Sequence, residues 1–345
     1  GDIRETDVLN AAMKNADASN LALLPASTVM VDLGKATPEE LHARLRPIFD
    51  AAPLDRRAAL VAWLTRQGMP REALTLITAQ EAGESTDAFI ARTQALAKLE
   101  NWPAVIEAAD AGGKAPLSLR LVTKARAEYA LRKQAQSGAK TLADALRAAA
   151  REGALPLIVP AGDEMGGRDV VDATLIELCG DSGTADEVFR MTRDRLSRRG
   201  PAAQEQLSEA HARALVAAPN AVSAQDYERY VKLLRALDDD ATEEEIAAFA
   251  VDPEETARAV AAAPADPAVR ATHALALLKA GRPQEAVAVF DDLTVFFNRV
   301  PPGQQAVICL VLAEGGQKAM AIQAAQVIER EMLMDVEKNL LQGLD

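Results

Sequence analysis

The stretch LLKAGRPQEAVAVFDDL, residues 277–293, predicts the fold of this chain. It reads as the end of one helix, a corner at Gly281 and the start of a second helix at Pro283. Glycine accepts the left-handed backbone that ends a helix, and proline suits a first helical turn because its missing N–H is not needed there. Two such short helices cannot bury their apolar faces alone, so we expect each pair to pack against neighbouring pairs.

The same arrangement recurs at three other places in the chain. The four corners stand at Gly68, Glu100, Gly281 and Gly316. A small residue follows each corner by five positions, at Ala73, Val105, Ala286 and Ala321, where it lets two helices approach closely. Positions 68 and 100 are 32 residues apart, and positions 281 and 316 are 35 apart. These intervals indicate a helix–turn–helix repeat of about 34 residues.

These residues resemble the tetratricopeptide repeat family. Three segments match its pattern of small, large apolar, glycine, alanine and apolar positions: Ala274, Leu277, Gly281, Ala286 and Phe290; Val61, Leu64, Gly68, Ala73 and Ile77; and Cys309, Leu312, Gly316, Ala321 and Ala325. The resemblance covers residues 54–112 and 267–330, which is less than half of the chain. It implies an all-α fold, a right-handed α-solenoid of antiparallel helix hairpins.

The composition agrees with an all-α fold. Hydrophobic residues make up 49% of the chain but aromatic residues only 3%, which suits closely spaced helices better than a β-sandwich. The formal net charge of -13 argues against general nucleic-acid binding, which needs a dense Lys/Arg surface. No window of 18 uninterrupted apolar residues is present, so we expect no transmembrane segment in the chain as given.

The pattern along the chain predicts five regions. They are a capping segment and helix at 1–53, repeat-like hairpins at 54–152, a loop insertion at 153–168, degenerate helical repeats at 169–264, and hairpins with a capping helix at 265–345. The loop prediction depends on two prolines and four glycines between 152 and 169. The uncharged run 18–31 is expected to be an extended capping segment or a surface buried by a second subunit or an upstream region.

The densest basic run is RMTRDRLSRR, residues 190–199. At 100° per residue, Arg190, Arg193 and Arg198 point away from the apolar stripe of the predicted helix. We expect a solvated outer face, or an electrostatic contact with the acidic run 238–245 or an acidic partner.

In the tetratricopeptide family the first helix of each pair lines a concave groove that binds polypeptides. The resemblance therefore implies a groove formed by Arg66, Gln94, Lys98, Leu275 and Lys279, joined by Tyr129 and Arg132 if the next pair keeps register. The scattered cations indicate an acidic or carboxylate-bearing protein or peptide partner. The asparagines with which some family members clamp a peptide carboxylate are absent from these positions, so that specificity is not expected.

The function predicted from these observations is a non-catalytic scaffold or adaptor that binds a polypeptide in its groove. The alternatives are a periplasmic or membrane-tethered assembly factor whose anchor precedes Gly1, and an α-helical enzyme. The sequence displays no clustered acids or histidines, so we expect no enzyme, no cofactor and no metal site. The Ala-rich composition, with Arg used more than Lys, is typical of a bacterial chain, either cytoplasmic or exported.

Overall fold

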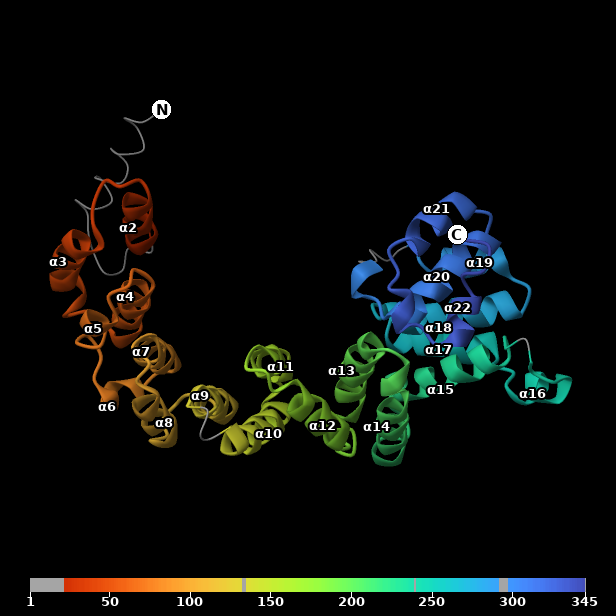
Figure 1. Ribbon diagram of the computed structural model, residues 1–345, viewed down its shortest axis with the longest axis horizontal. Helices are drawn as coiled ribbons and strands as arrows, with labels where there is room; N and C mark the ends of the chain where they lie inside the picture. The colour runs from red at the N-terminus through yellow and green to blue at the C-terminus, as the bar shows by residue number, and fades with distance from the viewer. Residues whose placement is uncertain (1–21, 132–134, 239, 292–296, 345) are drawn as a thin grey trace. The chain divides into compact units, whose positions relative to one another are not determined.

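A computed structural model describes residues 22–131, 135–238, 240–291 and 297–344. Every regular element in these ranges is a helix and none is a strand (Figure 1), which confirms the all-α prediction. Among the described residues, no helix is both long enough and apolar enough to span a bilayer.

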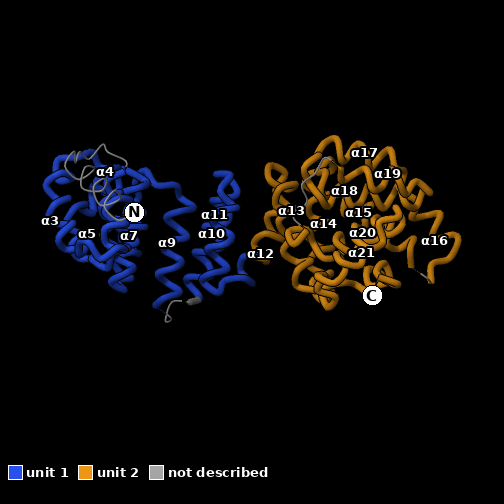
Figure 2. Tube along the Cα trace, turned by 90° about the horizontal axis from the view of Figure 1, so that it is seen from above, with its two compact units in different colours: residues 1–171 blue, residues 172–345 orange. Residues whose placement is uncertain are grey.

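The chain divides into two compact units, residues 1–171 and 172–345 (Figure 2). The described helices of unit 1 are α2 (Leu23–Asp32), α3 (Pro38–Phe49), α4 (Leu54–Arg66), α5 (Pro70–Ala73), α6 (Ala79–Ala82), α7 (Thr86–Lys98), α8 (Trp102–Asp110), α9 (Leu117–Ala130), α10 (Ala135–Glu152) and α11 (Leu155–Glu164). Helix α12 (Arg168–Leu178) contains the boundary between the units.

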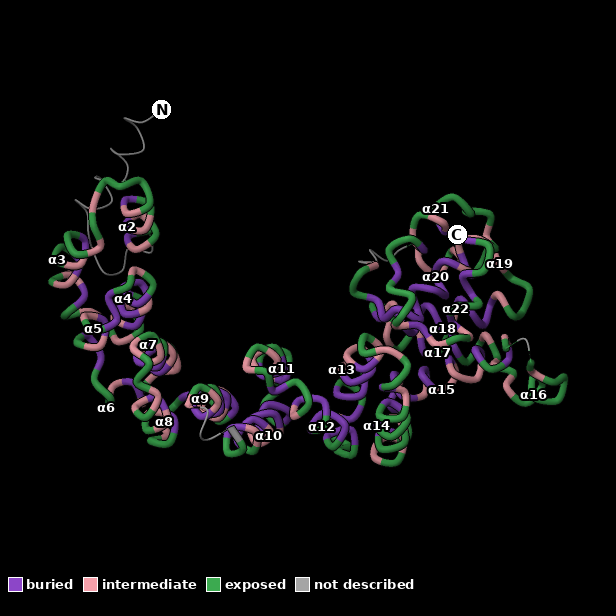
Figure 3. Tube along the Cα trace, viewed as in Figure 1, coloured by how far each residue is buried: buried purple, intermediate pink, exposed green. Residues whose placement is uncertain are grey.

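The described helices of unit 2 are α13 (Ala185–Leu196), α14 (Gln204–Ala217), α15 (Val222–Arg235), α16 (Glu243–Ala248), α17 (Pro253–Ala262), α18 (Pro267–Lys279), α19 (Pro283–Ala288), α20 (Pro302–Glu314), α21 (Lys318–Ala325) and α22 (Asp335–Asn339). Short 3₁₀ turns occur at η1 (Ser197–Arg199), η2 (Pro201–Ala203), η3 (Phe297–Arg299) and η4 (Arg330–Met332). Helices α18 and α20 are largely buried, whereas α16 is exposed along its whole length (Figure 3).

The core of unit 1 begins where α2, α3 and α4 meet. The cluster consists of apolar side chains around Trp63 on α4, which is fully buried. Trp63 Nε1 donates a hydrogen bond to Thr28 Oγ1 on α2 at 2.9 Å. A capping box at Thr37, whose side chain accepts from Glu40 N, starts α3. Apolar burial and one long-range hydrogen bond therefore hold α2 against α4.

The four predicted corners share one backbone geometry. Gly68, Gly281 and Gly316 have φ of 82°, 72° and 89°, and Glu100 has φ of 56°, the one positive φ at a non-glycine residue of the described part. After each corner an N–H donates to the carbonyl five residues earlier: Met69 to Leu64 at 2.9 Å, Asn101 to Leu96 at 3.0 Å, Arg282 to Leu277 at 2.9 Å and Gln317 to Leu312 at 2.7 Å. This is the Schellman motif, and it confirms the predicted left-handed corners.

Two segments predicted as extended or irregular are helices instead. Residues 23–31 of the 18–31 run lie in α2, because one face of this run, including Leu23 and Met30, is buried. The predicted loop 153–168 contains α11, which corrects the loop assignment. Pro156 lies in its first turn, where no donor is needed, and burial of Ile158 and its neighbours stabilises the helix.

The glycines that suggested a loop are sites of close packing. A Cβ atom on Gly162 would lie 2.6 Å from Val171 Cγ2, and one on Gly167 would lie 2.5 Å from Leu142 Cδ2. Both distances are too short for real carbon contacts. These glycines therefore let α10, α11 and the start of α12 approach one another.

The basic run 190–199 is solvated only in part, because Arg190 and Arg198 are exposed as predicted and Arg193 is buried. Arg193 is only 2% exposed and pairs with Asp194 and Asp266. Arg198 donates to the backbone carbonyls of Asn298 and Arg299 at 3.3 and 2.8 Å. These arginines act inside unit 2, and the predicted outer face is corrected for Arg193.

Candidate functional site

A groove of about 590 Å³ is present in unit 1 between α7, α8, α9 and α11. Its lining is mainly apolar and consists of Thr86, Ile90, Thr93, Gln94, Ala97, Trp102, Val105, Pro116, Ser118, Leu119, Val122, Thr123, Arg126, Glu152, Ala154, Leu157, Ile158 and Ala161. Leu157 on α11 is 76% exposed although it is a large aliphatic side chain. A concave, mostly apolar surface of this size is typical of binding sites.

The N-terminus of α9 is held in place by the end of α10. The Glu152 carboxylate accepts hydrogen bonds from the backbone N–H groups of Leu117 and Ser118 at 3.1 and 3.3 Å, and from Ser118 Oγ at 2.5 Å. A negative charge is favourable at this end of a helix, where N–H groups lack partners. Glu152 therefore fixes one wall of the groove and has little capacity left for a ligand.

Two of the hydroxyl groups in the groove, those of Thr93 and Thr123, are turned to their own helices. Thr93 Oγ1 donates to Phe89 O at 2.7 Å, and Thr123 Oγ1 donates to Leu119 O at 2.8 Å. Because these hydroxyls are occupied, the two threonines present mainly their methyl groups to the groove. This increases the apolar character of the surface.

Arg126 is the cation in the groove lining. Its Nη2 atom lies 3.2 Å from Glu164 Oε2, and the two side chains are 53% and 71% exposed. Exposed ion pairs of this kind contribute about 0–1 kcal/mol, so a ligand carboxylate can replace Glu164 at little cost. Arg126 and the amide of Gln94 are thus the polar groups that can orient a ligand over the apolar floor.

A close backbone approach positions the segment that leads into α9. Gly113 has φ of 119°, and a Cβ atom at this position would lie 2.6 Å from Gly83 O. The N–H of the following residue, Lys114, donates to the same carbonyl at 2.9 Å. A Gly113→Ala substitution therefore combines backbone strain with a backbone clash. We expect it to lower the free energy of unfolding by about 3 kcal/mol.

Gly112 provides the matched control for this prediction. It has φ of 82°, but its nearest neighbour would be Arg120 Nη1 at 3.9 Å, so Gly112→Ala adds strain without a clash. We expect a loss of only about 1 kcal/mol for this variant. Urea unfolding followed by tryptophan emission measures both, because Trp63 and Trp102 are in unit 1. Equal losses would contradict the close approach of Gly113 to Gly83.

The predicted groove residues are divided between the two units, and in unit 1 they have different surroundings. Gln94 lines the groove, whereas Arg66, Lys98 and Tyr129 belong to unit 1 but not to the lining. Arg66 Nε donates within its own helix to Ala62 O, and burial raises the pKa of Tyr129. Arg132 lies outside the described residues.

The two predicted groove residues of unit 2 have other surroundings. Leu275 is fully buried in α18, so it is a core side chain and not a surface one. Lys279 Nζ donates to Ala236 O at 2.8 Å, which caps the end of α15. A cation at the carbonyl end of a helix is a stabilising arrangement that needs no ligand.

The sequence reasoning missed the residues that form most of the groove. Trp102, Leu119, Leu157 and Ile158 line it. The signal that was available is the apolar run Leu155–Val159, which is too long and too apolar for a solvated loop. The two prolines of this helix favoured the prediction of a loop.

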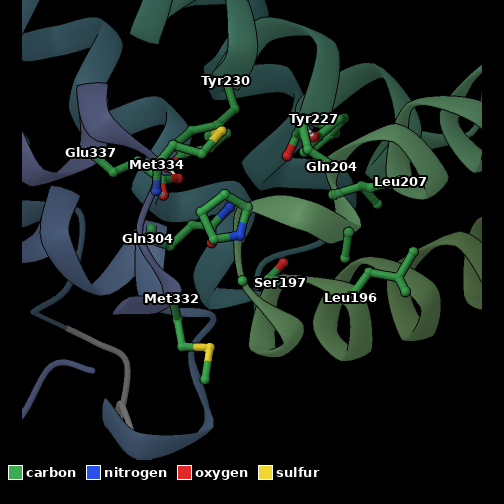
Figure 4. A pocket seen from close by; sticks show the side chains of 14 residues that line it. Leu196, Ser197, Gln204, Leu207, Tyr227, Tyr230, Gln304, Met332, Met334 and Glu337 are labelled. Carbon is green, nitrogen blue, oxygen red and sulfur yellow. Dashed lines mark hydrogen bonds between the residues drawn. The ribbon is translucent and has the colours of Figure 1, made fainter. Parts of the chain in front are cut away.

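A second cavity lies in unit 2 between α14, α15, α20 and the segment 332–337 (Figure 4). Tyr230 Oη donates to Glu337 Oε1 at 2.6 Å, and Gln204 Nε2 donates to Tyr227 Oη at 2.5 Å. Burial raises the pKa of Glu337 and raises that of Tyr227 to about 12. The volume of about 30 Å³ accommodates about two water molecules. This cavity is therefore too small for a ligand.

Among the described residues, no three His, Cys, Asp or Glu side chains are placed to hold a metal ion. Comparison of the chain with family models, with curated proteins and with solved structures found no match. The candidate site is therefore defined by its own geometry, as an apolar groove between four helices of unit 1.

Proposed function

We propose that the chain is a non-catalytic scaffold that binds a segment of another polypeptide in the groove of unit 1. In this proposal its helices form hairpins stacked as in a right-handed α-solenoid. The four corners with a common Schellman geometry support the hairpin repeat. The single observation that carries the binding function is the large apolar groove with Leu157 exposed at its edge.

The partner that fits best is an amphipathic helix. The groove follows α9 from Pro116 to Arg126, which are ten residues apart, or about 15 Å of helix length. This length matches about three helical turns, and such helices dock into apolar grooves through side chains at every third or fourth position. Glu152 already caps α9, so Arg126 is the charged group available to the partner. We propose that an acidic side chain of the partner pairs with it.

The test uses 12-residue peptides selected from a displayed random library against the full chain. In a Trp63→Phe background, Trp102 is the one remaining tryptophan and lies in the groove lining, so its emission reports binding. We expect the selected peptides to be amphipathic and acidic, and to shift Trp102 emission. Leu157→Lys places a solvated cation over the apolar floor, so affinity is expected to fall at least tenfold, or about 1.4 kcal/mol.

Val216→Lys is the matched control, because Val216 is 85% exposed but lies on α14 in unit 2, outside the groove. It is expected to keep the original affinity. If no peptide is selected, or if Leu157→Lys binds as tightly as the control, the groove is not a polypeptide-binding site.

A further inference from the structure

Three segments of unit 2 meet around a buried group of charges. Arg193 comes from α13, Asp226 from α15, and Asp266 from the residue that caps α18. Their exposed fractions are 2%, 1% and 9%. Arg193 Nη2 lies 3.5 Å from Asp266 Oδ2 and 3.2 Å from Oδ1 of its neighbour Asp194. The Arg193 guanidinium thus pairs with two carboxyl groups.

Asp226 has few hydrogen-bond donors for a buried acid. Thr272 Oγ1 on α18 donates to Asp226 Oδ2 at 3.0 Å. Oδ1 of Asp226 is buried, and no hydrogen-bond partner for it occurs in the described part of the chain. A buried carboxylate needs several donors, whereas a protonated carboxyl group needs fewer and carries no charge. A negative charge on Asp226 would therefore be held by a single hydrogen-bond donor in a buried position, which favours the protonated form.

The balance of buried charge leads to the same conclusion. Arg193 already pairs with Asp266, whose Oδ1 atom also accepts from the Ala268 N–H at 2.9 Å at the start of α18. Asp194 is 41% exposed at its side chain, so solvent screens it. An ionised Asp226 would add a negative charge with no cation of its own.

The other titratable groups around α15 do not supply that cation. Arg229, on α15 itself, acts to lower the pKa of Asp226, but burial has the larger effect, and Arg229 Nε lies 3.8 Å from Glu255 Oε2 of α17. Tyr227 and Tyr230 are kept neutral at physiological pH, because burial raises the pKa of both.

The remaining groups on the elements packed near α15 are turned to other partners or carry no positive charge. Glu337 of α22 accepts from Tyr230. Burial lowers the pKa of His211 on α14, which favours its neutral form. Arg270 of α18 donates to Pro264 O at 2.7 Å.

We propose that Asp226 is a proton-dependent lock of unit 2, which in its protonated form joins α15 to α18 and on deprotonation weakens the packing of α15 against its neighbours α13 and α18. The lock is independent of the groove and of the polypeptide-binding function proposed for unit 1.

The direction of the pH dependence follows from the pKa of Asp226. Burial raises it from 3.8 to about 7, although the Arg193 guanidinium and the Thr272 hydroxyl act in the opposite direction. Between these two values the folded state binds a proton that the unfolded state has lost. The contribution of Asp226 to stability is therefore complete below about pH 4, declines as the pH rises toward 7, and changes no further above pH 7.

The test is amide hydrogen exchange of the full chain between pH 4.5 and 8.5, with correction for intrinsic exchange rates. Peptides from α13, α15 and α18 report the lock, and peptides from α4 and α7 in unit 1 are the internal reference. The substitution is Asp226→Asn, which retains the shape of the side chain but cannot titrate. For each helix, the equilibrium constant for local opening in the original chain is divided by the same constant in Asp226→Asn. This ratio is expected to rise about a hundredfold between pH 5 and 7 and to level off above pH 7.

Glu209→Gln is the matched control, because Glu209 forms an exposed pair with Arg213 on α14. It is expected to retain the pH dependence of the original chain. If Asp226→Asn retains it as well, the lock does not exist. If Asp194→Asn removes the dependence and Asp226→Asn does not, the proton belongs to Asp194 and the proposal is wrong.

A second variant keeps the proposal testable if Asp226→Asn does not fold. Thr272→Val removes the hydroxyl that donates to Asp226 and thereby removes one interaction that lowers its pKa. The decline in stability is then expected to continue to a higher pH than in the original chain. An unchanged end point of the decline would contradict the proposed role of Asp226.

Discussion

Replacement of Arg193 by methionine is expected to destabilise unit 2 by about 4 kcal/mol at pH 7.5, because it leaves buried carboxyl groups without their cation. Arg193 is 2% exposed, and its guanidinium pairs with Asp266, which is itself 9% exposed. Methionine fills a similar volume, so the loss reflects the missing charge more than a cavity. The loss is expected to be smaller at pH 5, where the acids around this position can take up protons.

Hydrogen exchange of peptides from α13 and α18 measures this effect within unit 2. Arg282→Met is the matched control, because Arg282 forms an exposed pair with Glu285 at 2.5 Å. That variant is expected to leave the exchange of these helices unchanged. Equal behaviour of the two variants would mean that the Arg193 pair does not stabilise the core of unit 2.

Trp63→Ala is expected to lower the free energy of unfolding of unit 1 by about 4 kcal/mol. Trp63 is fully buried on α4, and its Nε1 atom donates to Thr28 Oγ1 on α2 at 2.9 Å. The substitution leaves a large cavity and removes this hydrogen bond. Because α2 is held through these contacts, we expect it to exchange its amide protons faster than α7.

Trp63→Phe separates the two contributions. Phenylalanine keeps most of the apolar contact but has no N–H, so the expected loss is about 1–2 kcal/mol. Urea unfolding followed by Trp102 emission measures both variants, because Trp102 remains in unit 1. An unfolding midpoint for Trp63→Ala equal to that of the original chain would show that α2 is not packed on α4.

Local hydrogen bonding explains why much of the fold could be predicted from sequence. A corner such as that at Gly281 needs one residue in the left-handed backbone conformation and one hydrogen bond from an N–H to the carbonyl five residues earlier. Both requirements lie within a short stretch of chain. The prediction succeeded even at Glu100, where the spacing outweighed the absence of glycine. The start of α3 at Thr37 was equally local, because a capping box involves only four residues.

The candidate site could not be predicted in the same way. Leu157 and Trp102 are 55 positions apart in the sequence, and they line one groove only because α8 and α11 pack on either side of α9. Gln94 was selected from the family pattern and does line the groove, but Leu275 was selected by the same rule and is buried. A repeat pattern specifies which face of a helix packs, but it does not specify what covers the opposite face.

The sequence by itself thus determined that the chain is helical and where four of its helix pairs turn, because those features depend on contacts within a few residues. The tertiary structure alone decided that the glycine-rich stretch 153–168 contains a helix, that Arg193 is buried, and where the groove lies. Those features depend on packing between segments far apart in the chain. There, burial of apolar area and pairing of buried charge outweigh the local preferences of proline, glycine and arginine.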